Sequence, residues 1–287
     1  MIQDSTPGIR RLFEKEGEKI MRRQEGFTLI ELLVVIAIIA LLLAILMPAL
    51  QRVKKQAGAA ACTANLHEWA LVFAMYTDDN NGLLMNGYSG GINGTWVGAL
   101  RSYYKEPKIR VCPTATKPMS EGARGPFAAW GVFGAGLAGD DPGWSGPKEQ
   151  GDYGSYGMNE LAYNAPPGES RSAQCWQTVN VKGAAEIPLL FDSVWYDVYP
   201  YDTDPPPEYS GDVLKTGGGG EMKRVCVNRH TGFINGLFMD WSIRKVGLKE
   251  LWTLNWYRGF NKANAWTKAG GVVPSDWPEW MRTFKDY

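Results

Sequence analysis

Residue types that can do acid–base or metal chemistry gather in the carboxyl-terminal half of the chain. His230 is one of only two histidines, and Asp240 follows it after nine intervening residues. If the strands predicted at 187–194 and 234–240 are neighbours, Asp192 lies close to both of these residues. A histidine with two acids can act as a general base or hold a metal. The candidate polar cluster consists of Asn159, Asp192, His230 and Asp240.

No second signature of catalysis accompanies this cluster in the sequence. The chain has no nucleophile elbow, no phosphate-binding loop, no HExxH motif and no paired-carboxylate pattern. The cluster therefore favours a buried hydrogen-bond network that fixes loops around a sheet. We predict that the protein is not an enzyme and that it holds no metal or other cofactor at these residues.

Four cysteines offer a second kind of chemistry, and all of them follow an apolar run near the amino terminus. They are Cys62, Cys112, Cys175 and Cys226. No Cys-x-x-Cys spacing supports zinc, whereas disulfides form if this part of the chain lies outside the cytoplasm. Four cysteines allow three pairings. We favour Cys62 with Cys112, which ties a long helix to the first loop of the domain, and Cys175 with Cys226.

An acidic and amide-rich run, residues 77–82, offers oxygen ligands for a hard cation. The sequence Thr-Asp-Asp-Asn-Asn-Gly suits calcium by its donor atoms. It lacks the spacing and the distal glutamate of an EF-hand, and the same residues are typical of a helix end. We favour the helix end and keep calcium as the alternative.

The apolar run itself spans residues 27–50 and carries one acid. Every side chain from Leu32 to Met47 is apolar, and with its flanks the run is long enough to cross a bilayer as a helix. Glu31 stands near its start, where a carboxylate is costly unless it finds a partner. A lone acid in such a run indicates a functional role.

The helix is predicted to continue beyond the apolar run. Apolar residues recur at helical spacing on one face between 51 and 77, a stretch without proline. These residues are Cys62, Leu66, Trp69, Ala70 and Phe73. We predict one helix from Phe27 to Tyr76, with its second half packed on a globular domain and its aromatic residues in the core.

The rest of the chain indicates an α+β domain with long loops. It contains 34 glycines, 17 prolines and 12 tryptophans, a composition unlike that of a helical bundle. Strands are predicted at 187–194, 225–227 and 233–246, the last with a reversal near Asp240. The 30 basic and 30 acidic residues balance, so no basic patch indicates a nucleic-acid partner.

The start of the apolar run resembles the processing site of type IV pilins and type II secretion pseudopilins. The resemblance rests on Arg22 and Arg23, then Gly26 and Phe27, then Glu31 in the apolar run. It implies that a prepilin peptidase cuts after Gly26 and methylates the amine of Phe27. It also implies that Glu31 pairs with the terminal amine of a neighbouring subunit during assembly.

Further positions fit the same family. Pro48 matches a proline that often bends or locally melts this helix. His230 and Asp240 resemble the mark of a group of large pilin-like proteins, in which His, nine residues and Asp-Gly occur near the carboxyl terminus. Here Trp241 replaces the glycine, so the turn after Asp240 must be built differently.

The resemblance implies a pilin-like α+β fold in which a long amino-terminal transmembrane helix packs on an antiparallel β-sheet. Residues 1–26 are then a leader that is removed, with Met1 or Met21 as the true start. Residues 27–50 form the transmembrane and filament-core helix, and residues 51–287 form the globular domain with the second half of the helix.

The function implied is that of a structural subunit of a type IV pilus-like or type II secretion filament. Its partners would be prepilin peptidase, other pilin or pseudopilin subunits, the membrane and an inner-membrane assembly platform. The chain would cross the inner membrane once, with its carboxyl-terminal domain in the periplasm, before it joins a periplasmic or extracellular filament.

A membrane-anchored binding module outside the cytoplasm, for a glycan or surface polymer, is the alternative. Its tryptophans would stack on sugars, and the apolar helix would serve only as an anchor. Glu31 separates the two hypotheses, because an anchor has no use for it, whereas staggered assembly does. An ordinary secretory signal peptide fits less well, since no small-x-small cleavage site follows a short apolar core.

Overall fold

The computed structural model of the chain describes residues 27–87, 95–131, 153–169, 171–213 and 220–287. Contacts divide the chain into two units, which meet between Leu50 and Gln51. The predicted leader, residues 1–26, lies outside the described part of the chain.

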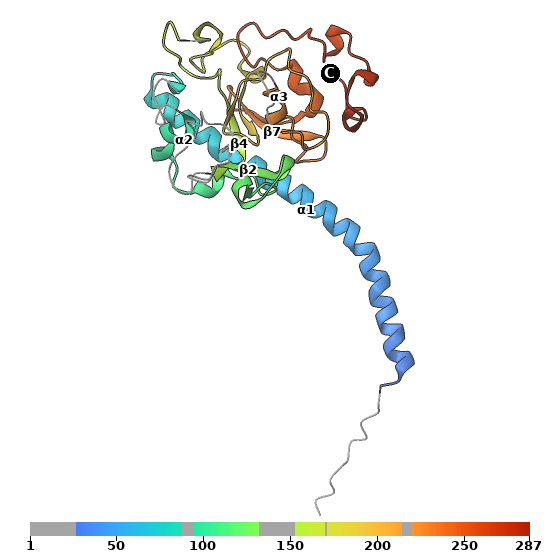
Figure 1. Cartoon of the computed structure of the whole chain (residues 1–287). Coiled ribbons are helices and arrows are strands. Elements are labelled where there is room, and N and C mark those ends of the chain that lie inside the picture. The colour runs from blue at the N-terminus through green and yellow to red at the C-terminus, as the bar shows by residue number, and fades with distance from the viewer. Residues whose placement is uncertain (1–26, 88–94, 132–152, 170, 214–219) are drawn as a thin grey trace, which may run out of the picture. The chain divides into compact units, whose positions relative to one another are not determined.

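Helix α1, Leu29–Asp79, is 51 residues long and confirms the long helix predicted from the sequence (Figure 1). Its first section, to Leu50, has every described side chain exposed, and it is long and apolar enough to cross a membrane. The helix continues through Pro48, whose ring nitrogen cannot donate to the carbonyl of Ala44. The bend expected at Pro48 remains a prediction.

The second section of α1 packs on the globular domain through the face predicted from the sequence. Cys62, Leu66, Trp69 and Phe73 are each fully buried. The helix ends at Asp79, and Asn81 and Gly82 then adopt left-handed backbone conformations with φ of 55° and 77°. The Gly82 N–H donates to the Thr77 carbonyl, so residues 77–82 end the helix as expected.

The main sheet has five strands in the order β6-β4-β5-β7-β8. Their bounds are Tyr156–Asn159 for β4, Pro188–Asp192 for β5, Asp197–Val198 for β6, Phe233–Phe238 for β7 and Ile243–Gly247 for β8. β4 pairs with β5, β5 with β7, and β7 with β8, all antiparallel. The edge strand β6 runs parallel to its neighbour β4. The α+β pilin-like architecture is therefore confirmed, with a mixed edge to the sheet.

The remaining elements are short. A second sheet has the order β1-β2-β3, with bounds Lys117–Pro118, Ala128–Gly131 and Tyr153–Gly154, and the short α-helices are α2, Trp96–Ala99, and α3, Met222–Val225. The 3-10 helices are Arg101–Tyr103, Pro107–Arg110, Met119–Glu121, Gly125–Phe127, Ser172–Gln174, Ala184–Glu186, Leu248–Thr253, Lys268–Gly270, Pro274–Asp276 and Glu279–Met281. The strand predicted at 225–227 is wrong, because the Cys226 N–H bonds back to the Met222 carbonyl and closes a helical turn instead.

The sheet separates two hydrophobic cores. Successive side chains of a strand point to opposite faces, and Leu237 packs with α1 while its neighbour Phe238 packs with the carboxyl-terminal residues. Six tryptophans are almost fully buried, and they divide between the two cores as Trp69, Trp96 and Trp130 in the first and Trp252, Trp256 and Trp277 in the second. The prediction that the aromatic residues of the long helix, Trp69 and Phe73, lie in the core is confirmed.

The turn between β7 and β8 shows how the chain replaces the missing glycine. Trp241 itself adopts a left-handed conformation with φ of 67°. Asp240 supports the turn, because its Oδ1 accepts hydrogen bonds from the Ser242 N–H at 3.0 Å and the Ser242 hydroxyl at 2.5 Å. A residue with a Cβ is strained in this conformation by about 1–2 kcal/mol, and the half-buried indole packs against the core on the α1 side of the sheet.

Replacing Trp241 by glycine and by alanine separates this strain from the packing of the indole. Both variants lose the indole, but only Trp241→Gly removes the strain. We expect Trp241→Gly to be more stable than Trp241→Ala by about 1 kcal/mol, as measured by urea unfolding of the full chain in detergent micelles. Equal stabilities would contradict a strained turn.

Candidate functional site

The amino-terminal end of α1 is built by a reciprocal cap. The Thr28 N–H and the Thr28 hydroxyl both donate to Glu31 Oε2 at 2.8 Å, and the Glu31 N–H donates to Thr28 Oγ1 at 3.2 Å. Threonine followed three residues later by glutamate is a capping box, which satisfies backbone donors that the first helical turn leaves free. Glu31 therefore has a local structural role that the sequence analysis did not consider.

The cap uses only part of the Glu31 carboxylate. Both donors go to Oε2, and no described residue donates to Oε1. The carboxylate is exposed, as are the apolar side chains that follow it along the helix. Glu31 can therefore keep its cap and still accept a hydrogen bond from a cation outside the chain. Phe27 is exposed as well, whereas the other half of the predicted cleavage site, Gly26, lies outside the described residues.

A second set of functional residues is buried where α1 crosses the sheet. Asp192 ends β5 opposite Tyr156 of β4, and the register turns its side chain toward α1. The Asn235 N–H of β7 donates to Asp192 Oδ2 at 2.9 Å, and the Cys62 thiol of α1 lies 3.5 Å from Oδ1. The carboxylate is fully buried and joins the helix to two strands.

His230 lies against the same carboxylate. Its Nε2 is 3.2 Å from Asp192 Oδ2 and 3.6 Å from Cys112 Sγ. The ring stacks on Phe233, with centroids 5.7 Å apart. We call Cys62, Cys112, Asp192 and His230 the buried cluster; one donor atom from each lies within 4.8 Å of all the others.

Arg229 provides a fixed positive charge beside the buried cluster. Its guanidinium donates to the carbonyls of Pro126 at 2.5 Å, Ala128 at 2.9 Å and Ser193 at 2.8 Å, and also to that of Ser155. Its Nη1 lies 3.4 Å from Asp192 Oδ1, and both side chains are fully buried. Arg229 thus joins the second sheet to β5 and balances the charge of Asp192.

These contacts change the acid–base properties of the buried cluster. Burial disfavours the charge of Asp192, but the hydrogen bond from His230 and the charges of His230 and Arg229 outweigh it, so the pKa of Asp192 lies below its ordinary value. Burial by itself lowers the pKa of His230, yet the hydrogen bond to Asp192 raises this pKa to about 9. The arrangement favours a charged pair of Asp192 and His230 in the folded protein.

The pKa values of the two thiols in the buried cluster are shifted in opposite directions. Burial raises the pKa of Cys62 well above its ordinary value. The hydrogen bond that Cys112 receives from the Cys62 thiol lowers the pKa of Cys112 to about 6, with further help from His230 and Arg229. One thiolate can therefore exist at neutral pH in the interior of the domain, beside cations that stabilise it.

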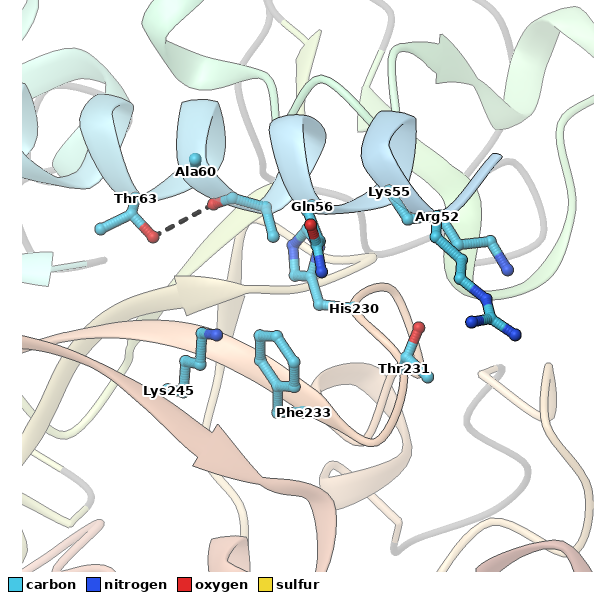
Figure 2. Close-up of a pocket in the computed structure, with 10 residues that line it drawn as sticks. Arg52, Lys55, Gln56, Ala60, Thr63, His230, Thr231, Phe233 and Lys245 are labelled. Carbon is cyan, nitrogen blue, oxygen red and sulfur yellow. Dashed lines mark hydrogen bonds between the residues drawn. The ribbon is translucent and has the colours of Figure 1, made fainter. Parts of the chain in front are cut away.

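A pocket of about 800 Å³ reaches His230 from the surface of the globular domain. Figure 2 shows that α1 lines one side and that the loop and strands around His230 and Phe233 line the other. Arg52, Lys55 and Lys245 also line the pocket. His230 Nδ1 is buried without a hydrogen-bond partner among the described residues.

The structure brings together only part of the predicted polar cluster. Asp192 and His230 are paired, but Asp240 is exposed and supports the β7–β8 turn. Asn159 donates to the carbonyls of Pro188 and Trp256, on the opposite face of β4 from Tyr156. The predicted inclusion of Asp240 and Asn159 was wrong, because the strand alternation and the turn direct their side chains elsewhere.

The sequence did not reveal that Cys62 and Cys112 belong to the buried cluster, or that Arg229 and Tyr156 lie against it. Helical periodicity placed Cys62 on the buried face, but nothing in the sequence indicated that β5 lies beneath it. All four cysteines are free and buried in the structure. The favoured pairing of Cys62 with Cys112 and of Cys175 with Cys226 remains a prediction, although the first two sulfurs lie within 4.8 Å.

Comparisons with known proteins agree with the amino-terminal resemblance. The family described as the prokaryotic N-terminal methylation motif matches residues 21–47. The chain is 48% identical over 66 residues to the type IV wide pilus major component PilA4 of Thermus thermophilus. That match covers 23% of this chain and 50% of the relative, so the chain spans about half the length of the curated relative. No solved structure matches the chain.

The resemblance to type IV pilins is thereby confirmed for the amino-terminal segment. The matched family covers the end of the predicted leader and most of the apolar run, including Gly26, Phe27 and Glu31. The matched family ends at residue 47, before Cys62, the first residue of the buried cluster.

Replacing Arg229 tests the electrostatic balance of the buried cluster. Arg229→Met removes one of the two positive charges that balance the buried Asp192 carboxylate. It also removes the donor to four buried carbonyls, so we expect a loss of about 3–5 kcal/mol in unfolding free energy. Arg258→Met is the control, because Arg258 is exposed and also donates to backbone carbonyls. Its expected loss is below about 1 kcal/mol. Urea unfolding of the full chain in detergent measures both, and equal losses would contradict the role of Arg229.

Proposed function

We propose that the protein is a structural subunit, a pilin or pseudopilin, of a type IV pilus-like or type II secretion filament. The observation that carries this proposal is the exposed apolar section of α1 with Glu31 at its first turn, inside a methylation motif that matches residues 21–47. The pilus component similar to this chain supports the same class.

The geometry at the first turn supports assembly through this helix. A processed subunit would begin with the amine of Phe27, a cation on an otherwise apolar surface. Glu31 Oε1 receives no hydrogen bond from the described residues and can accept one from the amine of a staggered neighbour. In a low-dielectric surrounding, neither charge is tolerated alone, whereas the pair is stabilised by mutual attraction. The apolar surface would then become the contact between subunits.

The further steps of this function belong to the same proposal. Prepilin peptidase would cut after Gly26 and methylate Phe27, and a membrane assembly platform would add subunits to the filament. The apolar helix would hold the unassembled subunit in the inner membrane with the globular domain in the periplasm. The globular domain would then lie on the outside of the filament.

The alternative, an anchored glycan-binding module, finds less support in the domain. Sugar stacking needs exposed aromatic rings, and no tryptophan within the described residues is exposed. Five of the six most buried indoles donate their N–H to backbone carbonyls, those of Ile109, Tyr196, Tyr156, Asp204 and Leu251. These tryptophans hold loops, and binding a sugar would require the core to open.

Glu31→Gln separates the cap from the charge. Glutamine still accepts hydrogen bonds from Thr28 and preserves the capping box, but it cannot neutralise an amine. We expect sedimentable filaments from cells carrying Glu31→Gln to fall at least about tenfold, since a lost charge pair exceeds 1.4 kcal/mol. Glu68→Gln on the exposed face of the same helix is the matched control and is expected to assemble normally.

Intact mass and amino-terminal sequencing of the same samples test processing. The expected mature terminus is methylated Phe27 in all three proteins. Normal filaments from Glu31→Gln would reduce Glu31 to a helix cap. Processed protein that stays monomeric with and without the substitution would favour the anchored module, and a terminus at Met1 or Met21 would contradict both hypotheses.

A further inference from the structure

The buried cluster has the donor set of a metal site. It contributes two thiol sulfurs, one imidazole nitrogen and one carboxylate oxygen, and all four residues are buried. The donors come from α1, from the turn after the 3-10 helix Pro107–Arg110, from β5 and from the loop before β7. They are therefore distant in sequence and are held together by the tertiary fold.

Three of the six separations between these donors fit a tetrahedral ion. With about 2.3 Å from zinc to sulfur and about 2.0 Å to nitrogen or oxygen, tetrahedral donors lie about 3.3 Å apart for nitrogen and oxygen, and about 3.5 Å apart for sulfur with either. The structure has 3.2 Å from His230 Nε2 to Asp192 Oδ2, 3.6 Å from His230 Nε2 to Cys112 Sγ, and 3.7 Å from Cys62 Sγ to Asp192 Oδ2. Each separation lies close to the tetrahedral value.

The charges also fit a divalent cation. Two thiolates and one carboxylate carry three negative charges, and a divalent ion with the neighbouring Arg229 guanidinium supplies three positive charges. A neutral His230 completes the set, so the loaded site has no net charge to bury. Arg229 is fixed by four backbone carbonyls and needs no rearrangement to provide this balance.

A second layer of hydrogen bonds holds the donors in place. The Tyr156 hydroxyl lies 3.2 Å from Cys62 Sγ, and the Thr114 hydroxyl lies 3.1 Å from Cys112 Sγ. The Asn235 N–H fixes the carboxylate of Asp192. Such outer contacts orient ligands in metal sites and raise their affinity for the ion. When Nε2 binds a metal, the neutral ring carries its proton on Nδ1, which has no acceptor among the described residues.

We propose that Cys62, Cys112, Asp192 and His230 bind a divalent metal ion of the zinc class, which fastens the second section of α1 to the sheet. Sulfur and imidazole donors in a tetrahedral arrangement select zinc over calcium or magnesium. Binding releases to solvent the protons held by the thiols and by the His230 imidazolium, and it changes no oxidation state. With all four positions filled by protein, the site is structural, because no position remains for water or a substrate.

A disulfide between Cys62 and Cys112 is the competing use of the two sulfurs. It would consume both thiols and leave Asp192 and His230 as a separate ion pair. The presence of an imidazole and a carboxylate at tetrahedral separations from the same sulfurs favours the metal.

The test uses the full chain purified in detergent without chelators, and intact mass under non-reducing conditions reports the state of the thiols. Zinc is counted per chain, the metal is removed, and the reduced protein is titrated with Co²⁺. We expect one metal ion per wild-type chain, visible absorption bands of tetrahedral cobalt with thiolate ligands, and a fall in Tm after the metal is removed. Cys112→Ser should lose the bands, and Cys175→Ser, a buried cysteine outside the cluster, should keep them.

The cobalt titration of the wild-type chain keeps the test independent of how Cys112→Ser folds. An isolated protein lighter by two hydrogen atoms, with Cys62 joined to Cys112, would overturn the proposal. So would reduced wild-type protein without cobalt bands, or full metal content in a folded Cys112→Ser. None of these outcomes depends on filament assembly. The metal proposal is therefore tested independently of the proposed function.

Discussion

A carboxylate removed from water at the contact between α1 and the sheet is the constraint on which the centre of the domain depends. Asp192 is fully buried, and an unpaired charge in such a position would cost several kcal/mol. The chain meets this cost with Arg229 and His230, which are adjacent in sequence and approach the carboxylate together. Because Arg229 also binds carbonyls of the second sheet, the same charge pair determines where the smaller sheet lies against β5.

The two units of the chain differ in how their apolar groups are placed: the first exposes them and the second buries them. Residues 27–50 expose a continuous apolar surface with one acid, which is stable only in lipid or against other helices. From Gln51 onward, apolar residues fill two cores, and the buried carboxylates of Asp192 and Glu221 are paired with arginines. A single helix, α1, carries both patterns, and the change occurs along its length without a break in the helix.

Periodic features of the sequence were sufficient to predict the helix and the strands near the cluster. The buried face of α1 follows from apolar residues at helical spacing, and β5 and β7 follow from short runs rich in apolar residues. The strand expected at 225–227 failed because three apolar residues also fit a helical turn. The composition of the buried cluster could not be predicted, since Cys62 and Asp192 meet only through the packing of α1 across the sheet. Asp240 was misplaced because spacing along the chain does not reveal which side of a turn a carboxylate supports.

The indole donors of the cores have an evolutionary consequence. Trp69, Trp96 and Trp252 each donate to a backbone carbonyl outside the strands and α-helices, those of Ile109, Tyr196 and Asp204. A carbonyl is present whatever side chain its residue bears, so these tethers place no demand on residue type at the positions they hold. These hydrogen bonds can therefore persist when the side chains of the tethered segments change.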